Sequence, residues 1–430
     1  MRRDMPNGRP RHSARRPEPT GDESIAPRGG ARTRTRLAAG LMAALLVGTL
    51  GCSGQADTAS AGSSAARSTT TTRTFPRSAR VDLLTSTFSH PTKITNPLFP
   101  IKLRQVIQLG HAADKSLHQE VTRLPYTKVI QFHGRGVETV VSQFVAYEQD
   151  RILEVAVDYF AQADDGSVWY FGEDVSTYEK GVVASHEGTW RAGKDGPPGM
   201  IMPAHPHVGD VYRPENIPGL VFEEVIVKAV GVTVAGPRGP VGGSVLVEEH
   251  PMDGAIELKH FAPGYGEFLA RVASEHEYVT AALANPTDAL PGALPRELAT
   301  LSTGATKVFQ AAPSAKWDRV SATVDKMTAA WKQYRKGLVT KLLRDQVNSR
   351  LAHLHSAVGA HDVAATRQAA LELSLATLDV ELQYRSTTAV DRDRIEAWQH
   401  QLAVDRAAHH SGAAAGDLAV IKTIQQRIGR

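Results

Sequence analysis

The middle of the chain, from about residue 94 to residue 280, alternates apolar and polar positions with a period near two. Residues 151–162 show this best, with Leu153, Val155 and Val157 on one face and Glu154 and Asp158 on the other. Similar runs at 168–171, 224–234, 244–249, 256–261 and 267–272 are separated by turns rich in Gly, Pro and Asp. Strands spaced this closely, without crossover helices, pair antiparallel. A meander, a sandwich and a partial barrel all satisfy this pattern.

After a segment rich in Pro, Gly and Ala, the apolar period changes to 3.6. Apolar stripes run from Trp317 to Leu338 and from Leu343 to Val358, and shorter stripes follow up to Ile428, with Ser314 and Asp362 as helix caps. Helices joined by short loops pack as antiparallel neighbours. The predicted fold class is α+β and multidomain: a β-rich domain at 85–280, a linker at 281–313 and a four- to five-helix bundle at 314–430.

The start of the chain has the pattern of an export signal. Three arginines at 32, 34 and 36 precede a fourteen-residue apolar run at 37–50, which is too short to span a membrane as a helix. The small Gly51 stands before Cys52, the only cysteine. This arrangement resembles the lipobox of bacterial lipoproteins, although Thr49 and Leu50 depart from the family's preference for Leu followed by a small residue. The resemblance implies that Cys52 carries lipid and becomes the new N-terminus.

We therefore expect residues 1–51 to be a signal peptide with an Arg-rich leader, and 52–84 to be a lipidated cysteine with a flexible Ser/Thr/Ala tether. A signal peptide followed by a free cysteine, and an uncleaved anchor, are the alternatives. The single cysteine excludes an intramolecular disulfide.

The basic isoelectric point, about 9.0, comes from the leader. Residues 1–51 hold ten arginines against four acidic residues, a net charge of +6, so the remaining residues carry −2 of the total of +4. Because the excess lies in the leader, it does not indicate a nucleic-acid-binding face.

Aromatic and acidic residues gather on neighbouring predicted strands of the β-rich region. A groove of aromatic rings edged with carboxylates would suit a ligand, whereas the same rings are also typical of core and cross-strand pairs. The candidate ligand-binding residues are Trp169, Tyr170, Phe171, Glu173, Asp174 and Trp190.

His205 and His207 form a His-x-His pair that would project to one face of a strand. With Glu173 and Asp174 they make the speculative metal site of a hydrolase. We find no motif of a known hydrolase or nucleotide-binding loop, no identifiable third metal ligand beside the pair, and no pattern that calls for a cofactor.

Four segments of the β-rich region occur in an order that resembles a family of uncharacterised secreted or lipid-anchored bacterial proteins. They lie at 94–100 (Ile-Thr-Asn-Pro-Leu-Phe-Pro), 169–174 (Trp-Tyr-Phe-Gly-Glu-Asp), 187–190 (Glu-Gly-Thr-Trp) and 199–204 (Gly-Met-Ile-Met-Pro-Ala). The resemblance covers about residues 90–275. It implies an extracytoplasmic β-rich domain and brings no reaction, ligand or catalytic residue with it.

The expected protein is an exported lipoprotein, anchored on the extracytoplasmic face of the cell membrane. We interpret it as a non-enzymatic protein that binds a ligand or partner, or acts as a scaffold, in the cell envelope. Its expected partners are the membrane, through the lipid, and an envelope protein, lipid or polysaccharide, but not nucleic acid. The alternative is an envelope hydrolase that uses His205 and His207 with Glu173 and Asp174.

Overall fold

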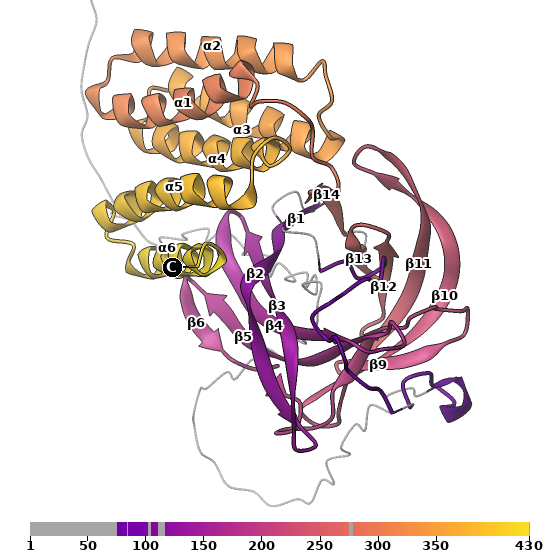
Figure 1. Cartoon of the computed structure of the whole chain (residues 1–430). Coiled ribbons are helices and arrows are strands. Elements are labelled where there is room, and N and C mark those ends of the chain that lie inside the picture. The colour runs from indigo at the N-terminus through magenta and orange to yellow at the C-terminus, as the bar shows by residue number, and fades with distance from the viewer. Residues whose placement is uncertain (1–74, 84, 102–104, 111–116, 275–277, 430) are drawn as a thin grey trace, which may run out of the picture. The chain divides into compact units, whose positions relative to one another are not determined.

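The computed structural model describes residues 75–83, 85–101, 105–110, 117–274 and 278–429. Cys52, the leader and residues 53–74 of the expected tether lie outside these residues. Residues 75–83 were also expected to belong to the flexible tether, but they contain a 3₁₀ turn and pack on the sheet, where the Phe75 amide donates to Glu224 and Arg80 bridges to Val211. The described chain folds into an antiparallel β-sheet followed by α-helices, which confirms the predicted α+β class (Figure 1). No helix in the described part of the chain is long and apolar enough to cross a membrane.

The sheet is a meander with the strand order β6-β5-β4-β3-β2-β1-β14-β13-β12-β11-β10-β9. Its strands are β1 (Gln105–Gly110), β2 (Leu117–Phe132), β3 (Arg135–Glu148), β4 (Arg151–Gln162), β5 (Val168–Glu179), β6 (Val182–Ser185), β7 (Trp190–Arg191), β8 (Gly199–Met202), β9 (Val211–Ile217), β10 (Val221–Gly236), β11 (Gly239–Pro251), β12 (Glu257–Ala262), β13 (Gly266–Val272) and β14 (Val279–Asn285).

Strand β8 brings β9, the last strand of this order, close to β5 near its other end. This strand pairs with β5, and its Gly199 lies so close to the backbone of Pro214 in β9 that a Cβ atom there would stand 1.8 Å from the Pro214 carbonyl oxygen. Among the alternatives left by the sequence, the structure is therefore a single, partly closed meander and not a sandwich of two sheets. β4 coincides with the predicted run at 151–162.

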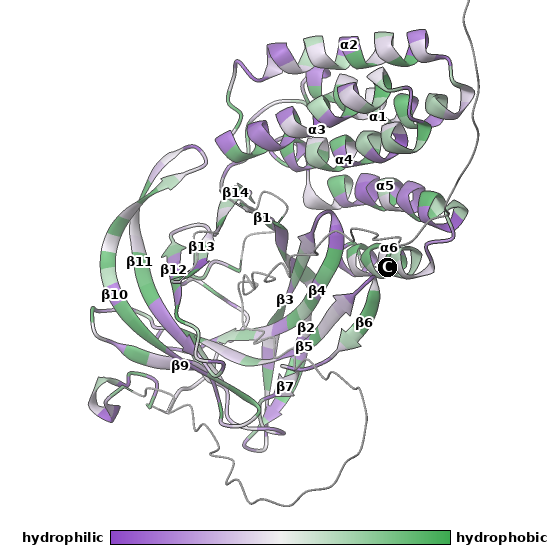
Figure 2. Ribbon diagram, turned by 180° about the vertical axis from the view of Figure 1, so that it is seen from behind, coloured by the Kyte–Doolittle hydropathy of each residue, from purple (hydrophilic) through white to green (hydrophobic). Residues whose placement is uncertain are grey.

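Six α-helices follow the sheet in the described chain, and five of them lie within 314–430, where four to five were predicted. They are α1 (Arg296–Ala311), α2 (Trp317–Tyr334), α3 (Lys341–Gly359), α4 (Val363–Glu381), α5 (Thr387–Ala407) and α6 (Ser411–Arg427), with short 3₁₀ turns η1 (Arg77–Ala79) and η2 (Ala312–Ser314). Figure 2 shows hydrophilic and hydrophobic residues side by side along these helices, as their amphipathic spacing requires.

The segment 281–313 is not a linker, contrary to the prediction. It contains the end of β14 and the whole of α1, whose Leu298, Leu301 and Val308 are fully buried at helical spacing. The flanking prolines and glycine suggested a loop, but Pro295 stands just before the helix, where its missing N–H costs nothing. The Asp362 cap is confirmed, since its side chain accepts a hydrogen bond from the Ala365 amide at 2.9 Å.

Two apolar interfaces join the helices to the sheet. At one, Ile107 of β1 and Leu283 of β14 pack in the core shared by α1 to α4. At the other, Val145 and Tyr147 of β3 pack with Trp398 of α5 and with α6. In the strand order β2 lies between β1 and β3, so the helix-facing side of β2 is enclosed between the two interfaces.

Candidate functional site

The side of β2 and its neighbouring strands that faces the helices carries polar residues, in contrast to the apolar interfaces on either side of it. Alternation along β2 turns His118, Glu120 and Thr122 toward the helices. Thr122 lies opposite Gln105 of β1 and Gln143 of β3, so the three residues form one row across three strands. His118 forms a row with Tyr147 of β3 and stacks on its ring at 5.4 Å. We call these residues, with the helix residues that meet them, the polar seam.

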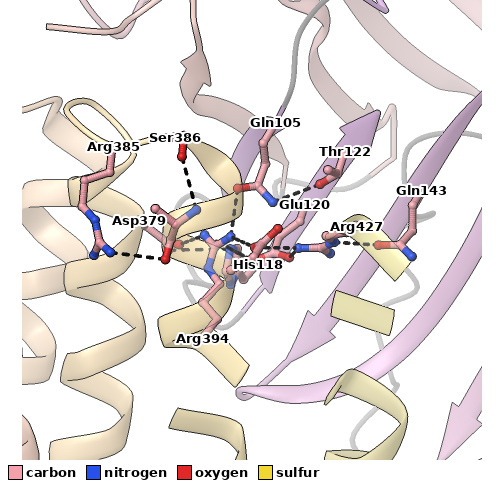
Figure 3. A network of polar contacts seen from close by, with 12 residues as sticks. Gln105, His118, Glu120, Thr122, Gln143, Asp379, Arg385, Ser386, Arg394 and Arg427 are labelled. Atoms are coloured by element: carbon pink, nitrogen blue, oxygen red, sulfur yellow. Dashed lines mark hydrogen bonds and ion pairs between the residues drawn. The ribbon is translucent and has the colours of Figure 1, made fainter. Parts of the chain in front are cut away.

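Helices α4, α5 and α6 each contribute charged side chains to the polar seam (Figure 3). Arg394 of α5 donates hydrogen bonds to Asp379 of α4 at 2.6 Å, to Gln105 at 2.8 Å and to Asp391 at 3.0 Å. The Nη2 atom of Arg394 lies 3.5 Å from Glu120 Oε1. Two carboxylates and a strand amide are thereby held by one guanidinium.

Arg427 of α6 closes the other side of the polar seam. Its Nε donates to Gln143 Oε1 at 2.6 Å, and its Nη1 forms an ion pair with Glu120 Oε2 at 2.5 Å and with Asp391 Oδ1 at 3.5 Å. Arg394 and Arg427 are 2% and 5% exposed. Buried arginines of this kind require partners on all sides, and these partners come from both the strands and the helices.

The arginines determine the ionisation of the polar seam. Burial alone would raise the pKa of Glu120, but Arg394, Arg427 and His118 lower it to about 2. For Asp391, burial raises the pKa although both arginines oppose it. Three carboxylates face two guanidinium groups, so the polar seam carries one negative charge in excess when His118 is neutral.

A small pocket opens on the polar seam. From the sheet it is lined by His118, Glu120 and Tyr147, and from the helices by Asp379, Arg394 and Trp398, with Asp150, Arg350 and Glu372 among the remaining lining residues. His118 Nε2 and Asp379 Oδ2 are buried there without a hydrogen-bond partner. Among the described residues, no serine, threonine or cysteine lines this pocket, and its hydroxyl group is the phenol of Tyr147.

The structure places the predicted aromatic residues in the core. Tyr170, Phe171 and Trp190 are at most 1% exposed and Trp169 is 6% exposed. Tyr170 stacks on Phe160 at 4.8 Å and meets Trp190 edge-on at 5.3 Å. These contacts are cross-strand and core packing.

Glu173 and Asp174 project to opposite faces of β5, as neighbours on a strand must. Glu173 is fully buried, whereas the Asp174 side chain is 53% exposed and pairs with Arg191 at 2.6 Å. His205 and His207 are exposed on the loop between β8 and β9, where His207 lies 3.5 Å from Asp210. The single group of potential metal ligands found in the described chain contains neither histidine. The structure does not bring these four residues together.

Glu173 belongs instead to a second polar region, on the inner face of the sheet. This face is the one opposite the helices on β3 and β4, where Asp158 pairs with Ser142. We call the set the inner carboxyl cluster. It contains Lys259, which forms ion pairs with three of its members, and it consists of Glu154, Asp158, Glu173, Glu215, Glu223, Glu249, Glu257 and Glu267.

Burial raises the pKa values of most of this cluster. It raises that of Glu154 to about 8 and that of Glu257 to about 7, and it raises that of Glu173 well above its ordinary range, with Glu215 and Asp158 adding to the effect. Glu154 has no hydrogen-bond partner for either carboxyl oxygen. A face with several neutral carboxyl groups at neutral pH is therefore built into the sheet.

Neither polar region was predicted as a site. The spacing of Glu154 and Asp158 did place both carboxylates on one strand face, but a polar face of a strand normally lies in water. The polar seam has no local signal at all, because Gln105 and Arg394 are 289 residues apart. No family model, curated protein or solved structure matches the chain.

Proposed function

We propose that the chain is an exported, lipid-anchored protein of the cell envelope that binds a small polar ligand and is not an enzyme. The arginine-flanked apolar run before Cys52 supports export and anchoring on the extracytoplasmic face. An envelope protein, lipid or polysaccharide is the partner we propose for the remaining surface.

The observation that carries the binding role is the pocket on the polar seam. Its walls come from both the sheet and the helices, and buried polar atoms face it without partners. A buried polar atom without a partner costs about 1–3 kcal/mol, so a ligand that satisfies it gains that energy. A ligand in this position would contact β2, α4 and α5 at once and stabilise their packing.

Binding is tested by the melting temperature of the full chain against a set of inorganic ions and small polar metabolites. We expect at least one to raise the melting temperature, and we expect Asp379→Asn to abolish this rise. Asp393→Asn is the matched control, because Asp393 lies on α5 outside the pocket and is 47% exposed. A ligand that stabilises the Asp379→Asn variant equally would refute the assignment of the pocket, and turnover of the ligand would refute the non-enzymatic role.

Anchoring is tested separately by labelling cells with a fatty-acid analogue. The label should appear on the unaltered chain and be lost in Cys52→Ala. Label that persists in the variant, or never appears, contradicts the lipid anchor and leaves the pocket proposal untouched.

A further inference from the structure

Three potential metal-ligand atoms converge in the pocket of the polar seam. They belong to His118, Glu120 and Asp379 and lie within 4.8 Å of one another. His118 Nε2 is 3.7 Å from Asp379 Oδ2 and 3.9 Å from Glu120 Oε1. Glu120 and Asp379 are fully buried, while the His118 side chain is 17% exposed.

Each of the two carboxylates divides its oxygens between an arginine and the histidine. Asp379 accepts from Arg394 through Oδ1, and its Oδ2 faces His118 without a hydrogen bond. Glu120 pairs with Arg427 through Oε2, and its Oε1 faces His118, with Arg394 at 3.5 Å. The arginines therefore hold both carboxylates in place, as outer-shell partners do around metal ions.

We propose that His118 Nε2, Glu120 Oε1 and Asp379 Oδ2 bind one divalent transition-metal ion of the zinc class. This inference rests on the proposed function, since it names the ligand of the same pocket. One imidazole with two carboxylates is a donor set that suits such ions, whereas calcium and magnesium prefer oxygen ligands alone.

The two separations from His118 Nε2 fit this ion after a small contraction, and the separation between the Glu120 and Asp379 oxygens is at most 4.8 Å. Tetrahedral zinc with ligand bonds of about 2.0–2.1 Å sets its ligand atoms about 3.4 Å apart. The two distances from His118 Nε2 exceed this by a few tenths of an ångström, which side-chain rotation supplies. Water would complete the set of four ligands.

The net charge of the polar seam also favours the binding of a metal cation. With His118 neutral, Glu120, Asp379 and Asp391 outnumber Arg394 and Arg427 by one charge, so the seam attracts a cation. The nearby guanidinium groups repel a metal ion and limit its affinity.

The experiment titrates the full chain, purified in detergent and stripped with a chelator, with Zn²⁺ by calorimetry and with Co²⁺ by visible absorption. We expect one equivalent of either metal and the absorption bands of a low-symmetry Co²⁺ site with a nitrogen ligand. Asp379→Asn keeps the shape of the side chain and the oxygen that accepts from Arg394, so it should fold. It should weaken Zn²⁺ binding by roughly 100-fold, at least the loss seen for outer-shell partners.

His118→Phe keeps the ring that stacks on Tyr147 and removes the nitrogen, so Zn²⁺ binding should be lost with little change in the melting temperature of the metal-free chain. His207→Phe, at an exposed histidine of the loop before β9, is the matched control and should bind normally. Absence of stoichiometric binding, equal binding by Asp379→Asn and His118→Phe, or loss in His207→Phe would overturn the inference. If Zn²⁺ fails but another ligand loses its effect in Asp379→Asn, only the metal is wrong; if every ligand fails, the pocket proposal fails as well.

Discussion

Replacement of Glu154 by glutamine should stabilise the protein at neutral pH. Glu154 lies on the inner face of β4, opposite Ala146 of β3 and Thr177 of β5, and is fully buried. Both of its carboxyl oxygens lack hydrogen-bond partners. Glutamine has nearly the same shape as the protonated acid, so the substitution removes the charge that the side chain would carry in the unfolded chain and leaves the packing unchanged.

The direction in which stability changes with pH follows from the direction of the pKa shift of Glu154. Burial, and secondarily Asp158, raise the pKa of Glu154 from 4.5 to about 8, so the folded state binds the proton more tightly than the unfolded state. Stability is full below pH 4.5 and falls as the pH rises to 8. At about 1.36 kcal/mol per pH unit, the loss reaches about 3 kcal/mol at pH 7. Relaxation and water entry reduce it, and we expect about 2 kcal/mol.

The assay is urea unfolding of the unaltered chain and of Glu154→Gln at pH 5, 6, 7 and 8. The two curves should coincide near pH 5 and separate progressively toward pH 8, with the variant more stable. Glu148→Gln is the control, because Glu148 is exposed at the end of β3, and it should follow the unaltered chain at every pH. A Glu154→Gln variant that parallels the unaltered chain from pH 5 to pH 8 would refute the account of the inner face.

Two further substitutions test the architecture. Arg394→Met removes one cation of a buried ion network and leaves Glu120, Asp379 and Asp391 without it. The free energy of unfolding, measured with urea, should therefore fall by about 3–5 kcal/mol. A loss below about 1 kcal/mol would show that the network contributes little to stability. Gly199→Ala places a methyl group against the Pro214 carbonyl, where backbone must move, and should lower the melting temperature by several degrees. Gly242→Ala is the control, because Gly242 also lies outside the left-handed region and its added methyl group would meet only Thr233 Oγ1 at 3.8 Å, so the melting temperature should change little.

Much of the fold could be predicted because its signals are local. The run at 151–162 alternates regularly and is β4, and the stripe predicted from Trp317 to Leu338 is α2 as far as Tyr334. α1 was missed because its stripe is short and lies between Pro295 and Pro313, so the breakers outweighed the periodicity. The partial closure of the sheet depends on contact between β8 and β9, which no local pattern records.

The candidate site could not be predicted in the same way. His118 and Glu120 read as a polar stretch of an ordinary strand, and Asp379 and Arg394 as polar positions on helices. Their meeting depends on the docking of the helices on β2, which follows from apolar contacts on either side. The histidines at 205 and 207 are conspicuous in the sequence because they are close together. In the structure, however, both lie on an exposed loop.

Glu120 and Glu154 show what separates the two polar regions. Both are glutamates with almost no exposure, on strands of the same sheet, yet the pKa is about 2 for one and about 8 for the other. Burial raises the pKa of both carboxyl groups, but of the two only Glu120 has two guanidinium groups beside it, which lower its pKa. Glu120 is therefore ionised at neutral pH and its contribution to stability is lost as the pH falls from 4.5 toward 2, whereas that of Glu154 is lost as the pH rises toward 8. Fixed charges between one strand and three helices can set the position of the helices on the sheet and can attract a cation, whereas neutral carboxyl groups can do neither.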